Sequence, residues 1–197
     1  DVICGGSQKA LSAPPGLAFV TVSDKAMEVM EHRKVPVASF YCNLLTFKNY
    51  KKEKWFPYTM PASDINGLEE AVRLVQEDTE RITRHEKIAQ AVRQAVTAAG
   101  LSLYLNFGDA NTVTVIRVPE GMKDTDIIRH MKETYGILIS GSFDVLAGKV
   151  IRLGHMGNNA RKDEVAAMLE ALEKTLADLG FVCKKSMAEE FAKVLDS

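Results

Sequence analysis

The hydrophobic pattern at the start of the chain predicts two short strands joined by a turn. Residues 1–4 are apolar and β-branched in their middle and run into a glycine turn at 5–7. A second apolar run, 17–22, follows the rigid Pro-Pro-Gly turn at 14–16. Two apolar strands need neighbours and a covering layer. We therefore expect them to belong to a larger sheet whose other strands lie upstream of Asp1.

The middle of the chain predicts a long helix after an irregular stretch. Ser23 or Asp24 caps a short helix that begins at Lys25, whereas residues 34–62 show no clean period and carry many aromatic side chains. From 63 to 99 an apolar stripe recurs at helical spacing and is closed by a glycine. An unbroken helix of that length would extend about 50 Å, which predicts that it bridges two domains.

The remaining pattern predicts a small α+β domain with helices packed on one face of its strands. The expected elements are strands at 102–105, 112–118, 137–140 and 149–154, and helices at 124–135, 162–179 and 186–195. The chain is therefore divided into residues 1–83, which include the start of the long helix, and residues 84–197.

Composition and charge exclude several classes of protein. The chain has 197 residues and a net charge of −1, which gives no reason to expect nucleic acid or an anionic membrane as partner. No apolar run is long enough to span a bilayer, and we expect no signal peptide. The three cysteines are far apart and the four histidines are scattered. This predicts no metal site and a cytoplasmic protein with free thiols.

Candidate chemistry begins at Lys9. A lysine directly after a strand-ending glycine turn lies at the carboxyl edge of a sheet, where open α/β folds place ligands. The alternative is a solvated surface lysine, which is the usual state of this residue type. The residues alone leave both readings open.

A family resemblance favours the first reading. The segment Gly6-Ser7-Gln8-Lys9-Ala10-Leu11 with Pro14-Pro15-Gly16 resembles the cofactor-lysine motif of class V aminotransferases, in particular the alanine–glyoxylate and serine–pyruvate group. Residues 56–61 are similar to that family's cofactor-phosphate loop, and residues 150–154 to its substrate-carboxylate strand. The resemblance implies an α/β fold, the C-terminal part of a fold-type-I pyridoxal-phosphate-dependent transferase. It would comprise the end of the large-domain sheet, the long linking helix and the small C-terminal α+β domain.

The resemblance also implies roles for four residues. Lys9 would hold pyridoxal 5′-phosphate as a Schiff base and move a proton at the substrate. Gln8 would lie close to the cofactor phosphate, or else form a hydrogen bond that stabilises the loop. Thr59 would reach the phosphate of the neighbouring subunit's cofactor, because the family's active sites lie at the interface of a homodimer. Arg152 would bind the substrate carboxylate through its planar fork, or else form a structural ion pair.

Three further side chains have open interpretations. Many family members have a tyrosine where this chain has Phe56, so the phosphate loses one contact unless Tyr58 replaces it from another angle. Both aromatic rings could instead be interface packing. His155 could face the site entrance or be a surface or hydrogen-bonded loop histidine.

The function implied is transfer of an amino group from alanine or serine to glyoxylate or pyruvate. Alternatives are ureidoglycine- or phosphonate-type aminotransferases, a cysteine desulfurase or lyase, and a non-catalytic folded fragment. Desulfurases usually have histidine where this chain has Gln8. The aspartate that pairs with the pyridine nitrogen and the phosphate cup would lie upstream of Asp1, so the fragment alone is expected to have little or no activity.

Overall fold

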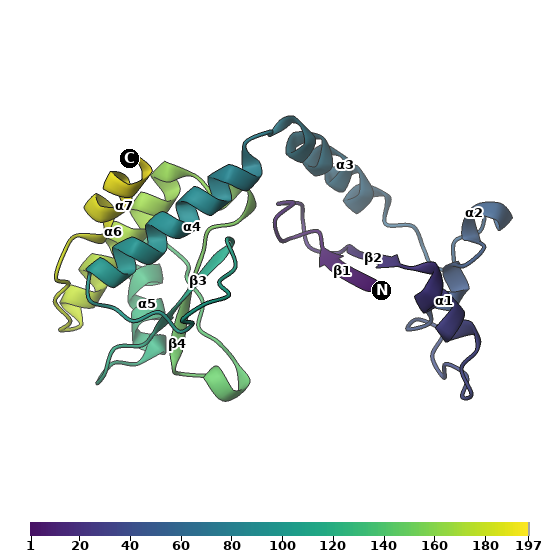
Figure 1. The fold of residues 1–197 in the computed structure, drawn as a ribbon, viewed down its shortest axis with the longest axis horizontal. Helices are drawn as coiled ribbons and strands as arrows, with labels where there is room; N and C mark the ends of the chain where they lie inside the picture. Colours follow the sequence, from purple (N-terminus) through teal and green to yellow (C-terminus); the bar gives the residue numbers. More distant parts are fainter. Residues whose placement is uncertain (197) are drawn as a thin grey trace. The chain divides into compact units, whose positions relative to one another are not determined.

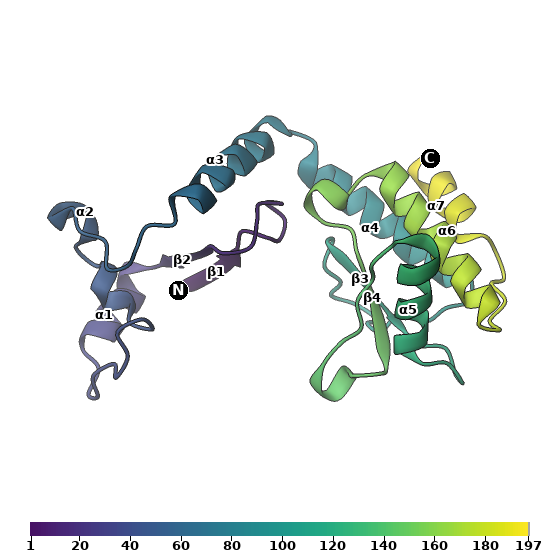
Figure 2. The ribbon, with the colours of Figure 1, turned by 180° about the vertical axis from the view of Figure 1, so that it is seen from behind.

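The computed structural model describes residues 1–196, which form two compact units (Figures 1 and 2). The first unit is Asp1–Glu77 and the second begins at Asp78. The division falls six residues before the end of the expected N-terminal part at 83. Each unit is described by itself below.

A β-hairpin opens the first unit. Strands β1 (Val2–Gly6) and β2 (Ala18–Val22) pair antiparallel, with Val2 opposite Val22 and Gly6 opposite Ala18. Both strands were predicted. Within the described chain they pair only with each other, and Ile3 is 71% exposed. The hairpin thus leaves apolar side chains in solvent, as strands taken from a larger sheet would.

Short helices follow the hairpin. Helix α1 (Asp24–Glu31) begins after Ser23, whose hydroxyl accepts a hydrogen bond from the Ala26 N–H and caps the helix as expected. The stretch that follows α1, which shows no clean hydrophobic period, contains a 3₁₀ turn, η1 (Leu44–Phe47), and one helical turn, α2 (Tyr50–Glu53). The longer helix α3 (Ala62–Glu77) completes the unit.

The single helix predicted over 63–99 is wrong, because the chain turns between α3 and α4 (Arg81–Ala98). The carbonyl of Asp78 accepts hydrogen bonds from the backbone N–H and the guanidinium of Arg81 instead of continuing the helical ladder. The Asp78 carboxylate pairs with both terminal nitrogens of Arg84. These side-chain bonds stabilise a local alternative to the helix.

The second unit contains a two-stranded antiparallel sheet. Strands β3 (Val113–Arg117) and β4 (Val150–Gly154) pair with Val115 opposite Arg152. The strands expected at 102–105 and 137–140 are reduced to single bridges, Leu103 to Ile116 and Ser140 to Arg152. Both segments lie beside the sheet as predicted but pair too briefly to count as strands.

The helices of the second unit enclose its core on one face of the sheet. They are α4, α5 (Asp124–Tyr135), α6 (Lys162–Asp178) and α7 (Met187–Leu195), with 3₁₀ turns η2 (Asp144–Leu146) and η3 (Gly157–Asn159). Helices α4 and α6 both pack on α7 (Figure 1). Ile151 and Leu153 of β4 join the buried cluster. Since neighbouring strand residues point to opposite faces, Arg152 points away from that cluster.

Candidate functional site

Lys9 lies on a loop that the backbone closes tightly. The loop joins β1 to β2, and its ends are bridged by the Ser7 N–H, which donates to the Leu17 carbonyl over 3.0 Å. The Ala13 N–H donates to the Ser7 carbonyl over 3.0 Å, and the Ser12 N–H to the Lys9 carbonyl over 2.9 Å. Lys9 is therefore part of a compact turn rather than of a free loop.

The side chain of Ser7 is central to this loop. Ser7 is completely buried. Its hydroxyl donates to the Pro14 carbonyl over 2.6 Å and accepts from the Leu17 N–H over 3.3 Å. One buried hydroxyl thus satisfies two backbone groups on the returning side of the loop. Sequence reasoning used Ser7 only as part of a motif and missed this role.

Two glycines shape the same loop. Gly16 has a φ of +144°, in the region that disfavours other residues, and a Cβ there would lie 3.1 Å from Oδ2 of Asp64 on α3. A Cβ on Gly6 would lie 2.7 Å from Oε1 of Gln8. The Gln8 amide therefore lies over Gly6, and a larger residue at position 6 would make this exposed side chain move.

Lys9 and Gln8 present their polar ends to solvent. Both residues are exposed. Within the described residues, neither the Lys9 amine nor the Gln8 amide forms a hydrogen bond or ion pair, so Gln8 makes no loop-stabilising side-chain bond there. The two side chains are adjacent on a fixed backbone and are available to a ligand.

Thr59 lies in the extended stretch just before α3 and is exposed. Its neighbours Phe56 and Tyr58 belong to a cluster of aromatic rings, and the Tyr58 hydroxyl donates to the Tyr41 carbonyl over 2.9 Å. Phe56 packs edge-on against Phe47. The two aromatic side chains are thus engaged in packing. Among the described residues, no hydrogen bond uses the Thr59 hydroxyl or joins it to the Lys9 loop.

Arg152 lies in the middle of β4, in the second unit. Its Nε donates to the Gly141 carbonyl over 2.6 Å, and the residue is half-buried. In the described part of the chain its guanidinium has no carboxylate partner. A structural ion pair, the alternative considered for this residue, is therefore absent from the described residues.

His155 is a buried, hydrogen-bonded residue rather than a surface one. Its Nε2 lies 2.9 Å from Oγ1 of Thr114, and its Nδ1 is buried without a hydrogen-bond partner among the described residues. Burial lowers the pKa of His155 to about 4, with a smaller contribution from the charge of Arg93. The ring is therefore neutral at physiological pH.

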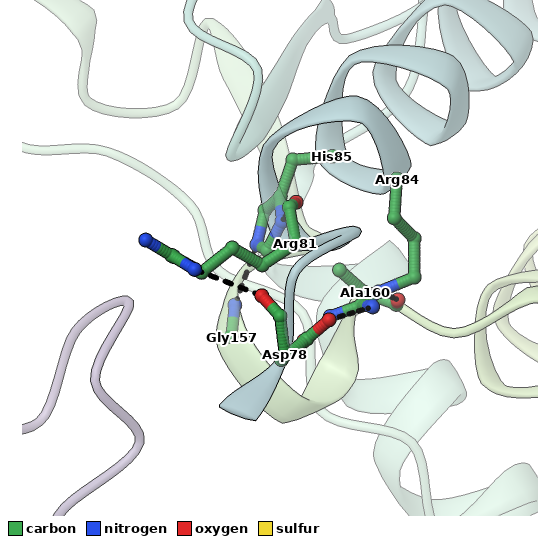
Figure 3. A network of polar contacts seen from close by, with 6 residues as sticks. All are labelled: Asp78, Arg81, Arg84, His85, Gly157 and Ala160. Atoms are coloured by element: carbon green, nitrogen blue, oxygen red, sulfur yellow. Dashed lines mark hydrogen bonds and ion pairs between the residues drawn. The ribbon is translucent and has the colours of Figure 1, made fainter. Parts of the chain in front are cut away.

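A polar network fixes the segment that follows β4 (Figure 3). The Arg84 Nε donates to the Ala160 carbonyl over 3.0 Å. His85 connects two groups: its Nδ1 lies 2.5 Å from the Arg81 carbonyl, and its Nε2 accepts from the Gly157 N–H over 2.9 Å. Since a carbonyl only accepts and an N–H only donates, His85 is the neutral Nδ1–H tautomer. The network holds the segment that follows β4 against the start of α4.

The described residues contain no group of three or more histidine, cysteine or acidic side chains that could hold a metal ion. Nor is any helix of residues 1–196 long and apolar enough to cross a membrane. Of the four predicted site residues, Lys9, Gln8 and Thr59 lie in the first unit and Arg152 in the second.

Comparison with known proteins finds relatives, although no family model matches the chain. An uncharacterised aminotransferase of Methanocaldococcus jannaschii is 40% identical over 199 aligned positions, which cover 99% of this chain and 51% of that protein. Relatives that are 33 to 37% identical are named as L-aspartate–, alanine– and serine–glyoxylate aminotransferases. The chain spans about half the length of the curated relatives it matches.

Two solved structures agree with this relationship. Pyridoxamine–pyruvate aminotransferase from Mesorhizobium loti superposes with a TM-score of 0.90 and 32% identity, covering 100% of this chain and 52% of that one. Ureidoglycine–glyoxylate aminotransferase from Bacillus subtilis gives a TM-score of 0.88 at 30% identity and the same coverage. The fold is that of part of a pyridoxal-phosphate-dependent transferase. By sequence and fold together, the chain belongs to the class V aminotransferases.

Proposed function

We propose that the chain is the C-terminal half of an aminotransferase that moves an amino group from alanine or serine to glyoxylate or pyruvate. The observation that carries the proposal is Lys9, whose free amine is presented by a loop that the buried Ser7 holds closed. The names of the relatives favour glyoxylate or pyruvate as acceptor. Unit one would be part of the cofactor-binding large domain, and unit two the small domain.

The residues present fit pyridoxal 5′-phosphate. Lys9 offers an unpaired amine, and Gln8 and Thr59 offer an amide and a hydroxyl that have no partner in the described chain, which suits a phosphate. We propose that Thr59 serves the cofactor of a second subunit, which makes the active enzyme a homodimer. When bound, the cofactor supplies an electron sink for charge that develops at the substrate Cα.

Three residues of the chain would hold the cofactor, transfer the proton and bind the substrate. Lys9 would hold the cofactor through its amine and would carry a proton to and from the substrate Cα. Arg152 binds the carboxylate shared by the amino acid and the 2-oxo acid, because its charge is permanent and its Nη atoms are unpaired in the described chain. Gln8 orients the phosphate.

Other chemistry of the family is less well supported. The desulfurases need a reactive mobile cysteine, but burial raises the pKa of the Cys183 thiol, which makes it a poor nucleophile. Cys42 is exposed on a turn and unpaired as a thiol. Three free cysteines favour a cytoplasmic location. The experiment below distinguishes a ureidoglycine-type donor from alanine and serine.

The test uses the enzyme made from its complete coding sequence. Adding alanine or serine should convert the bound cofactor to its amino form, seen by absorbance, and glyoxylate should reverse the change. Lys9→Ala should abolish both this exchange and covalent fixation by borohydride, whereas Lys34→Ala, at an exposed position, should leave both intact. If borohydride labels Lys9 but only ureidoglycine or a phosphonate donor changes the spectrum, the donor assignment is wrong. If no cofactor is fixed at Lys9, the proposal fails altogether.

A further inference from the structure

Arg152 has only part of its guanidinium available for a ligand. The Nε–H is used by the Gly141 carbonyl at 2.6 Å, a short bond to a cationic donor. The backbone of Arg152 is fixed on the same side, since its N–H donates to the Ser140 carbonyl, also over 2.6 Å. A carboxylate can pair with guanidinium side-on, through Nε and one Nη, or end-on, through both Nη atoms. The Gly141 carbonyl excludes the side-on arrangement.

Side chains of α5 fill the space beside Gly141. A Cβ on Gly141 would lie 2.9 Å from Oδ2 of Asp124 and 3.3 Å from Cδ1 of Ile128. The Asp124 side chain cannot turn away freely, because its Oδ1 accepts a hydrogen bond from the Thr125 N–H over 2.8 Å. The Asp124 carboxylate therefore lies so close to the Gly141 backbone that a side chain at position 141 would require one of the two residues to shift.

We propose that Gly141 is a positioning residue for substrate binding. Its carbonyl holds Arg152 so that a substrate carboxylate binds end-on through Nη1 and Nη2, and the carboxylate of Asp124 leaves room at position 141 only for a residue without a Cβ unless one of the two shifts. The inference rests on the proposed function in one respect, namely that Arg152 receives a carboxylate. The hydrogen bond and the crowding of position 141 by Asp124 stand on the geometry alone.

The geometric part is tested in the complete enzyme by nuclear magnetic resonance with labelled arginine. The Arg152 Nε–H signal should be protected from solvent exchange, and Gly141→Ala should shift it and remove the protection. Gly154→Ala is the matched control, because Gly154 lies two residues from Arg152, has nothing within 4 Å of its missing Cβ and has no left-handed φ. An unchanged Nε–H signal in Gly141→Ala overturns the proposal.

The functional part is tested in the complete enzyme. Gly141→Ala should raise KM for pyruvate about tenfold, with a smaller change in kcat, while Gly67→Ala, at a position inside α3 where a Cβ has ordinary contacts, leaves both values near those of the unmodified enzyme. A shifted Nε–H signal with an unchanged KM would show that Gly141 does not position the site. If Arg152→Lys also leaves KM unchanged, the error lies in the proposed function instead.

A second variant tests the role of Asp124. Serine at this position can still accept the Thr125 N–H but lacks the oxygen that crowds Gly141. The double variant Asp124→Ser with Gly141→Ala should therefore recover the Nε–H signal and most of the affinity for pyruvate. Failure to recover either overturns the role of Asp124. If Gly141→Ala does not fold, Asp124→Glu keeps Gly141, pushes a carboxylate towards it and should shift the same signal; no shift would count against the proposal.

Discussion

The hydroxyl of Ser7 donates a 2.6 Å hydrogen bond to the carbonyl of Pro14, seven residues later, and so closes the loop that carries Lys9. The same oxygen accepts from the Leu17 N–H. A buried polar atom with two partners stabilises a structure mainly because its removal leaves both partners unpaired. The Ser7 hydroxyl thus holds the Lys9 loop closed together with the backbone hydrogen bonds of the loop.

Ser7→Ala should therefore destabilise the chain. The Pro14 carbonyl and the Leu17 N–H lose their partner, at a cost of about 1–3 kcal/mol in the free energy of unfolding. Denaturant titration of the 197-residue chain measures this change. Ser39→Ala, which removes a hydroxyl that accepts an exposed hydrogen bond from the Cys42 N–H, should change stability by less than about 0.5 kcal/mol. Equal effects of the two substitutions would refute the importance of Ser7.

Two glycines of the first unit should respond to alanine in opposite ways. Gly67 lies inside α3, and a Cβ there would contact Pro14 at an ordinary 3.6 Å. Gly67→Ala should therefore stabilise the chain by up to about 1 kcal/mol through helix propensity. Gly16→Ala forces a Cβ onto a φ of +144° and should destabilise by about 1 kcal/mol or more. Thermal unfolding followed by circular dichroism checks both signs.

His155 should make stability depend on pH. Its pKa is about 4 in the folded chain and about 6.5 when unfolded, so between these values the unfolded state binds a proton that the folded state does not. The stabilisation is complete above pH 6.5 and is lost as the pH falls towards 4, by up to about 3 kcal/mol. Unfolding titrations from pH 7 to 4 should show a shallower slope in His155→Gln. An identical slope in the variant would contradict burial as the cause.

Arg152→Lys should weaken the binding of both substrates. Lysine keeps the charge but loses the planar pair of Nη donors, so KM for alanine and for pyruvate should each rise about tenfold or more. Steady-state kinetics of the complete enzyme measures this. Arg117→Lys is the control, because Arg117 is an exposed residue of β3 whose guanidinium lies over the Tyr104 ring. A similar rise in that variant would point to a general effect of surface charge.

Sequence reasoning worked best where local signals agree. Helix α5 runs over Asp124–Tyr135, the predicted range, because acidic residues favour its first turn and Gly136 terminates it with a left-handed φ of +67°. The two strands of the hairpin were likewise found from their apolar runs and flanking turns. Periodicity and caps act over a few residues and can be read directly.

The failures have long-range causes. The break between α3 and α4 depends on the side chains of Asp78 and Arg84, six residues apart, pairing with each other, and the apolar stripe continues across the break. Ser7 and Gly141 were missed for the same reason. Their partners Pro14 and Arg152 are seven and eleven residues away, and only the folded backbone brings them together.

The Gln8 amide lies over Gly6 at the free end of a flexible, exposed side chain. A Cβ at position 6 would lie 2.7 Å from its Oε1, so Gly6→Ala would make the amide rotate to another position while the backbone bonds of the loop stay in place. A change at position 6 would therefore act on the neighbour of Lys9 rather than on the fold. At Gly5 a Cβ would meet the Phe19 ring at 3.4 Å, and no such movement of Gln8 is expected there.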